Sequence, residues 1–148
     1  MNIEIKEVSE FHITEQRYRW LKDEEVDRYI GFAEELEPNV TYQLKPDNER
    51  HFEIYFENSL AGDIRFLYNS EDDKIAKRAE FIIIIGKRNR GLGSLALPLV
   101  IEKVKTYYTS IYCYIHKSNF RSLKLMKKNG FYVSDIEGAE LLLELDLN

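Results

Sequence analysis

Residues 86–94, Gly-Lys-Arg-Asn-Arg-Gly-Leu-Gly-Ser, combine glycines and arginines between an apolar run and a helical pattern. Glycine lets a backbone approach an anion closely, and the amides that open a helix attract negative charge. Arg88 and Arg90 add positive side chains to the same segment. These residue types predict a site for a diphosphate group. The alternative is an ordinary strand-to-helix turn with solvated arginines.

Two common phosphate-binding loops do not fit this segment. A Walker A loop would accept Gly86 and Gly91 but then requires Lys followed by Ser or Thr, where residues 92–93 are Leu-Gly. A dinucleotide fingerprint fits the later glycines but expects an acidic residue about 20 positions further on. Residues 111–115 contain none. A doubly wound nucleotide-binding domain is therefore the weaker hypothesis.

A second motif follows the glycine loop: Asn119-x-x-Ser122 on a predicted helix, then Gly130-Phe131. Together with Arg88-x-x-Gly91-x-Gly93, it resembles the two cofactor motifs of the GNAT N-acetyltransferases. The resemblance covers residues 79–133. Residues 20–29 and 60–64 more loosely resemble the RimJ/RimL-type branch, which acts on protein N-termini and amino sugars.

The resemblance implies acetyl-CoA as cosubstrate. It further implies that the central strand splays from the next strand, so that free backbone groups hold the pantetheine arm and one strand amide stabilises the developing oxyanion. The alternative is an unbroken ladder. The implied cofactor-binding residues are Ile83, Ile84, Ile85, Arg88, Asn89, Arg90, Gly91, Leu92, Gly93, Ser94 and Asn119.

Glu80 directly precedes the apolar run. By the same resemblance, this is the position where many family members carry the general base. A neutral amine is needed for attack, and burial would raise the pKa of a carboxylate toward a useful range. The competing interpretation is a structural carboxylate paired with Lys77 or Arg78.

Met126 departs from the family pattern, because many members place a tyrosine there that protonates the leaving thiolate. A thiol has a pKa of about 8.5, so this leaving group needs little help. Ser122 is the first candidate for the proton donor, with Tyr112, Tyr114 or a water as alternatives. A serine in a first helical turn is also a common local cap.

The remaining histidines and the cysteine show no pattern of their own. His12, His51 and His116 lack the short spacings typical of metal ligands, so we predict no metal site. His116, at the end of a predicted strand, is more simply a surface histidine than a second base. The single cysteine, Cys113, lies within a predicted strand and is expected to be a packed core residue.

Hydrophobic periodicity supplies the elements that must position these residues. We predict strands at 2–8, 51–56, 60–68, 79–85, 110–115, 131–133 and 139–147. Helices are predicted after Thr14 and after Asp23, from Leu92 onward, and at 119–128. This order predicts an α+β, GNAT-like fold whose mixed, mostly antiparallel sheet has about six to seven strands, flanked by about four helices.

Three local details complete the predicted fold. Asn58-Ser59 is expected to form a hairpin turn, and Ser70–Asp73 is expected to be a solvated loop. The helix from Leu92 is expected to pack one stripe on the sheet. Its members are Leu95, Ala96, Leu99, Val100 and Val104.

Composition limits the class of protein. The 148 residues suit one domain, 1–148, and a net charge of -5 argues against nucleic acid as a partner. The longest aliphatic stretch, 81–85, is far shorter than the roughly 20 residues of a membrane-spanning helix. The charged N-terminal segment and the lone cysteine favour a cytoplasmic protein.

These features predict an N-acetyltransferase that transfers acetyl from acetyl-CoA to a primary amine by direct attack, without a covalent enzyme intermediate. The acceptor is a protein N-terminus, an amino sugar or another small amine such as a polyamine, and a homodimer is left open. The alternative is a noncatalytic acyl-CoA-binding regulatory or assembly protein.

Overall fold

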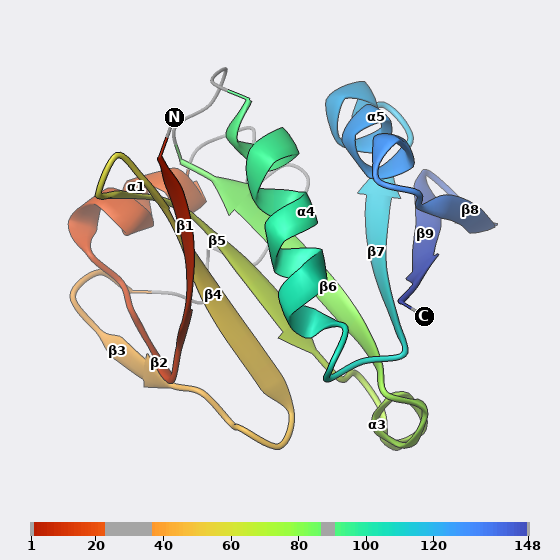
Figure 1. Cartoon of the computed structure of the whole chain (residues 1–148), viewed down its shortest axis with the longest axis horizontal. Helices are drawn as coiled ribbons and strands as arrows, with labels where there is room; N and C mark the ends of the chain where they lie inside the picture. The colour runs from red at the N-terminus through yellow and green to blue at the C-terminus, as the bar shows by residue number, and fades with distance from the viewer. Residues whose placement is uncertain (1, 23–36, 87–90, 148) are drawn as a thin grey trace.

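The structure is a computed structural model that describes residues 2–22, 37–86 and 91–147. Within these ranges, seven strands form one sheet in the order β1-β4-β5-β6-β7-β9-β8 (Figure 1). Neighbouring strands are antiparallel except β6 and β7, which are parallel. The strands are β1 (Ile3–Val8), β4 (Glu49–Phe56), β5 (Ser59–Leu67), β6 (Arg78–Ile85), β7 (Ser110–His116), β8 (Tyr132–Glu137) and β9 (Glu140–Asp146).

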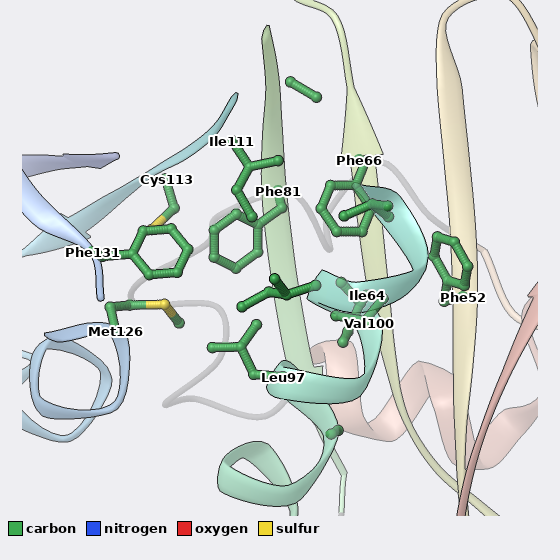
Figure 2. Packing of buried hydrophobic residues seen from close by; sticks show 14 of the residues in the cluster. Phe52, Ile64, Phe66, Phe81, Leu97, Val100, Ile111, Cys113, Met126 and Phe131 are labelled. Atoms are coloured by element: carbon green, nitrogen blue, oxygen red, sulfur yellow. The ribbon is translucent and has the colours of Figure 1, made fainter. Parts of the chain in front are cut away.

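The face of the sheet shown in Figure 2 is covered by α4 (Leu92–Val104) and α5 (Phe120–Lys128). Leu97 of α4 and Met126 of α5 belong to the main core together with Phe81 of β6. The Phe81 ring lies 5.9 Å from the Phe66 ring and 5.4 Å from the Phe131 ring, measured between centroids. Aromatic residues thus link the two halves of the sheet under these helices.

The opposite face of the sheet carries α1 (Glu15–Lys22) and a two-stranded ribbon of β2 (Glu10–His12) and β3 (Thr41–Gln43). Phe11, Ile13 and Leu21 pack there against Ile84 of β6. The predicted cap of α1 is confirmed, because the amide of Arg17 donates to Thr14 Oγ1 at 3.0 Å. The helix predicted after Asp23 lies outside the described residues.

The apolar stripe of α4 differs from the prediction. Leu97 and Ile101 are buried, whereas Leu95 and Leu99 are 41% and 45% exposed. Spacing alone allows either set, because residues three and four apart share a face and the helix is apolar almost all round. The contacts with the sheet choose the rotation of the helix.

Two further predictions are wrong in detail. Ser70–Asp73 is not a loop: Ser70 caps α3 (Glu71–Ala76), and its hydroxyl accepts from the amide of Asp73 at 3.0 Å. The β4–β5 turn consists of Glu57 and Asn58, with φ of 50° and 67°, and Ser59 already belongs to β5. Such a two-residue turn needs positive φ at both positions, which asparagine tolerates well.

The other predicted elements within the described residues are confirmed with small shifts at their ends, except that β8 extends to Glu137 where the prediction ended at 133. The β2–β3 ribbon was not foreseen. The fold is α+β, with a mostly antiparallel seven-stranded sheet and helices α1, α3, α4 and α5 among the described residues. None of the described helices is long and apolar enough to cross a membrane.

Candidate active site

The parallel strands β6 and β7 separate at the centre of the sheet. Their ladder runs from the Arg78–Ser110 pair to the Glu80–Tyr112 pair, where the described pairing ends. Each strand keeps its other neighbour, since β6 pairs with β5 up to Ile85 and β7 pairs with β9 to its end. The two ribbons diverge beyond that point (Figure 1). The facing edges of residues 81–85 and 113–116 therefore lack the hydrogen bonds of a ladder, as predicted around Ile83–Ile85.

The start of α4 follows β6 and presents backbone amides without a side-chain cap. Gly91 is the N-cap with a φ of 68°, and it makes no side-chain cap hydrogen bond. The first intrahelical bond of this turn runs from Leu95 N to Gly91 O at 3.3 Å. The amides of residues 92–94 thus have no partner inside the helix. This geometry suits an anion, and the positive φ at 91 favours glycine there.

Close packing fixes two glycines beside these groups. A Cβ on Gly86 would lie 2.1 Å from the ring of Trp20, and a Cβ on Gly62 would lie 2.4 Å from the carbonyl oxygen of Ile84. Trp20 of α1 and Gly62 of β5 therefore both press against the end of β6. Trp20 and Gly62 each belong to one segment of the looser resemblance.

Glu80 lies half-buried at the last rung of the β6–β7 ladder. Its Oε1 accepts from Nδ2 of Asn69 at 2.6 Å, and the same nitrogen donates to the hydroxyl of Tyr112 at 2.9 Å. That hydroxyl donates to Oδ2 of Asp73 at 2.7 Å. Burial, together with the bond to the Asp73 carboxylate, raises the pKa of Tyr112 to about 12. The neutral hydroxyl of Tyr112 thus binds Asp73 directly and is connected to Glu80 through Asn69.

The alternative role for Glu80 was an ion pair with Lys77 or Arg78, and the structure does not pair it with Arg78. Arg78 binds Glu144 at 2.6 Å and Asp73 at 3.3 Å, and its guanidinium lies 3.8 Å from the centre of the Tyr112 ring. Asn69 was missed as the partner of Glu80. It follows β5 with no distinguishing spacing, and only the pairing of β5 with β6 brings it to Glu80.

Asn119 and Ser122 lie at the start of α5, beyond the end of β7. Oδ1 of Asn119 accepts from the amide of Ser122 at 3.4 Å, so the asparagine caps the helix. Ser122 is half-buried in the first turn. Met126, one turn further on, is only 2% exposed and packs in the main core near Phe131 (Figure 2). The side chain at the usual tyrosine position thus fills the core here.

The other residues considered from the sequence lie at the margins of this region. Cys113 is buried in the main core, and burial, together with the nearby charge of Glu80, raises its pKa to about 12. His116 ends β7, and its Nδ1 lies 2.7 Å from the hydroxyl of Ser118. Among the described residues, no group of three His, Cys, Asp or Glu side chains could hold a metal ion.

Residues 3–132 match a protein-family profile described as an acetyltransferase (GNAT) domain. The chain belongs to the GNAT acetyltransferase family. Its GNAT fold confirms the predicted fold class, and membership agrees with the predicted use of acetyl-CoA. Curated proteins give no significant sequence match.

Several solved structures share this GNAT fold. The N-acetyltransferase PseH of Campylobacter jejuni has a TM-score of 0.67 and 20% identity, over 99% of each chain. Another PseH structure, a complex with acetyl coenzyme A, gives the same score over 99% of this chain and 100% of PseH. A chimera of spermidine N-acetyltransferase SpeG from Vibrio cholerae and hSSAT gives 0.59 and 19%, over 68% of each chain. These identities establish the fold alone.

The GNAT structure brings most of the predicted site residues together. Glu80 lies where the ladder opens, Ile83–Ile85 line the open edge of β6, and Gly91–Ser94 begin α4. The side chain of Ile84 is buried on the α1 side, so only its backbone is available at that edge. Arg88, Asn89 and Arg90 lie outside the described residues.

Proposed function

We propose that this chain transfers the acetyl group of acetyl-CoA to a primary amine by direct attack, without a covalent enzyme intermediate. One observation carries the proposal: the β6–β7 ladder ends at Glu80, so a carboxylate stands at the mouth of an unpaired strand edge. The reaction needs a place for the linear cofactor arm next to a base. The unpaired edge of β6 would provide the place, and Glu80 would provide the base.

The cofactor would be held mainly by backbone groups. The amides of Leu92, Gly93 and Ser94 would bind the diphosphate, since they point out of the helix end with the positive end of its dipole. The free edge of β6 at Ile83–Ile85 would bind the pantetheine arm. Arg88, Asn89, Arg90 and Asn119 complete the proposed set. When bound, acetyl-CoA supplies an acetyl group activated as a thioester.

Glu80 would accept the proton that the attacking amine loses. It lies on the same face of β6 as Ile82 and Ile84, because side chains alternate along a strand. The acceptor would therefore approach from the α1 side of the sheet, away from α4. The bond from Asn69 fixes one carboxylate oxygen and leaves the other for the amine.

Ser122 remains the proposed proton donor to the departing thiolate. It is half-buried in the first turn of α5, whereas Met126 carries no proton to give and Tyr112 is bound to Asp73. A thiolate whose conjugate acid has a pKa of about 8.5 needs only weak assistance.

The acceptor would be a small amine or a protein N-terminus. The structural relatives named above include a spermidine N-acetyltransferase, which keeps polyamines among the candidates. Placement in the RimJ/RimL-like branch is a further proposal. It is supported by the joint packing of Trp20 and Gly62 against the end of β6.

A thiol-release assay tests the function. The purified chain is incubated with acetyl-CoA and a panel of amines, and free coenzyme A is measured with a chromogenic thiol reagent. Cys113 gives little background, because it is buried with a raised pKa. We expect coenzyme A release that depends on the amine. Measurable cofactor binding by calorimetry with no release for any amine would favour the noncatalytic acyl-CoA-binding protein.

A further inference from the structure

A cavity of about 410 Å³ lies on the α1 side of the sheet, which is the face that carries Glu80. Strands β4, β5 and β6 form its floor and the β2–β3 ribbon contributes Phe11 and Tyr42 to its wall. Leu67, the cross-strand partner of Glu80, and Ile82, two residues along β6, also line it. The cavity therefore begins next to the proposed base, where an acceptor would have to lie.

Two buried polar atoms of the cavity residues lack hydrogen-bond partners in the described structure. They are Nδ1 of His51 and Nε of Arg65. Both residues line the cavity, and they face each other as a cross-strand pair of β4 and β5. An unpaired buried polar atom is costly, so each such atom needs an explanation, and a bound ligand that supplies the missing bond is one.

The chemistry of these two atoms is complementary. Nε2 of His51 lies 2.8 Å from Oδ1 of Asp63, and as the donor in that bond it leaves Nδ1 as an acceptor. Nε–H of Arg65 is a donor, while its Nη2 already binds Glu49 at 2.7 Å. A hydroxyl group matches this pair, because it donates through its proton and accepts through its lone pairs.

The two carboxylates of the described cavity lining, Glu49 and Asp63, are each already paired with an arginine. Asp63 receives two bonds from Arg17, at 2.9 Å and 2.7 Å, and Glu49 is paired with Arg65. Arg17 also binds Glu53 at 2.6 Å. Among the described residues of the lining, a second ammonium group on the acceptor would therefore find no unpaired carboxylate and would lose its hydration without compensation.

We propose that this cavity holds the body of the acceptor, and that the acceptor is an amine with one positive charge, an apolar face and a hydroxyl group directed at His51 and Arg65. The apolar face would pack on Phe11, Leu44, Leu67, Ile82 and Ile84. This assignment rests on the proposed function for the identity of the reacting amine. It selects hydroxyl-bearing amines, such as amino sugars, over polyamines.

Three ring amines of similar size test the assignment: 4-aminocyclohexanol, cyclohexylamine and 1,4-diaminocyclohexane. Their dissociation constants are measured by ligand-observed NMR on the full chain with coenzyme A bound, which needs no turnover. We expect the amino alcohol to bind about tenfold more tightly than either of the others, because only it satisfies both unpaired atoms.

Arg65→Lys keeps the charge opposite Glu49 but removes the Nε donor, so it should abolish the preference for the amino alcohol. Arg50→Lys is the matched control. Arg50 is on β4, in the same hairpin as Arg65, and it pairs with Glu7 at 2.7 Å, outside the cavity. It should keep the preference. Leu44→Trp should weaken all three amines by filling the cavity, with the affinity for acetyl-CoA unchanged.

Tightest binding of the diamine, or a preference that survives Arg65→Lys in folded protein, would overturn the assignment. Coenzyme A release with the same amines is scored separately. Selective binding without release would refute the proposed transfer and leave the cavity assignment standing. Coenzyme A release with other amines, without selective binding of the amino alcohol, would support the proposed transfer and refute the cavity assignment.

Discussion

Among the described residues, one hydrogen bond holds Glu80 at the last rung of the β6–β7 ladder, donated by the side-chain amide of Asn69 at 2.6 Å. Residues 78, 80 and 112 lie close together, yet Arg78 binds Asp73 and Glu144 rather than Glu80. The single residue that matters most for the proposed chemistry is thus oriented by a neutral side chain, which leaves its charge available to an amine.

Glu80→Gln tests this role, because glutamine can still accept the Asn69 bond but is not a base. We expect kcat/KM at about pH 7 to fall about 100-fold, within the usual range for losing a general base, with unchanged affinity for acetyl-CoA. Glu102→Gln, on exposed α4 surface, is the control and should keep full activity. A near-wild-type rate in folded Glu80→Gln would show that another group takes the proton.

At the scale of elements, α4 both packs in the core and carries the proposed diphosphate site at its first turn. Its N-terminal conformation depends on Gly91, which has a φ of 68° and open space around a notional Cβ. A side chain there meets no clash, so any effect of substitution comes from backbone strain. This makes strain at the proposed diphosphate site separable from packing.

Gly91→Ala should lower the free energy of unfolding by about 1 kcal/mol, the cost of placing an L-residue in the left-handed region. It should also weaken acetyl-CoA binding severalfold, as the following amides shift. Gly138→Ala is a matched control, because Gly138 has a φ of 63° and equally open space in the β8–β9 turn. It should show the same loss of stability in urea unfolding with unchanged calorimetric affinity. Equal affinities for both variants would contradict the diphosphate site.

The rotation of α4 yields a second comparison within one helix. Leu97 is fully buried and Leu99 is 45% exposed. Leu97→Ala should cost about 2–5 kcal/mol of stability through lost burial and a cavity, whereas Leu99→Ala should change it by less than about 0.5 kcal/mol. Urea unfolding of both variants measures this difference. The opposite order would mean that the helix packs by the stripe predicted from spacing.

At the scale of the whole molecule, Cys113 reports on global unfolding. The pKa of its thiol is raised from 9.0 to about 12 in the folded chain, chiefly by burial. The neutral thiol is therefore favoured by folding, and the corresponding stability is complete below about pH 9 and lost as pH rises toward 12. Tyr112, with its pKa also raised to about 12, adds to this loss at higher pH.

We expect thiol reagents to modify native Cys113 slowly at about pH 8, at a rate that rises with urea in step with unfolding. Stability should fall from about pH 9 upward, and Cys113→Ala should reduce that fall. Rapid modification of the fully folded chain without urea would show that the thiol is accessible and contradict its place in the core.

Much of this architecture could be predicted from local patterns. The strands, the cap of α1, the glycine loop before α4 and the Asn119 motif each depend on residues close in sequence, whose spacing and turn chemistry act locally. The order of strand, loop and helix around 79–133 also indicated the family, because both cofactor motifs lie within it. Sequence alone could thus predict the family, whereas the cofactor-binding residues stay a prediction.

Contacts between distant segments decided the rest. The β4–β5 register shifts between Ile54 and Tyr55, so His51 faces Arg65; an unshifted hairpin would place it opposite Ile64, on the other face of the sheet. A one-residue shift exchanges the two faces, and no local pattern announces it. The sequence by itself determined most of the strands and helices and the two motifs of the family resemblance, but not α3 or the β2–β3 ribbon. Only the tertiary structure decided which side chains meet in the proposed acceptor cavity, because register and helix rotation are set by packing across the whole sheet.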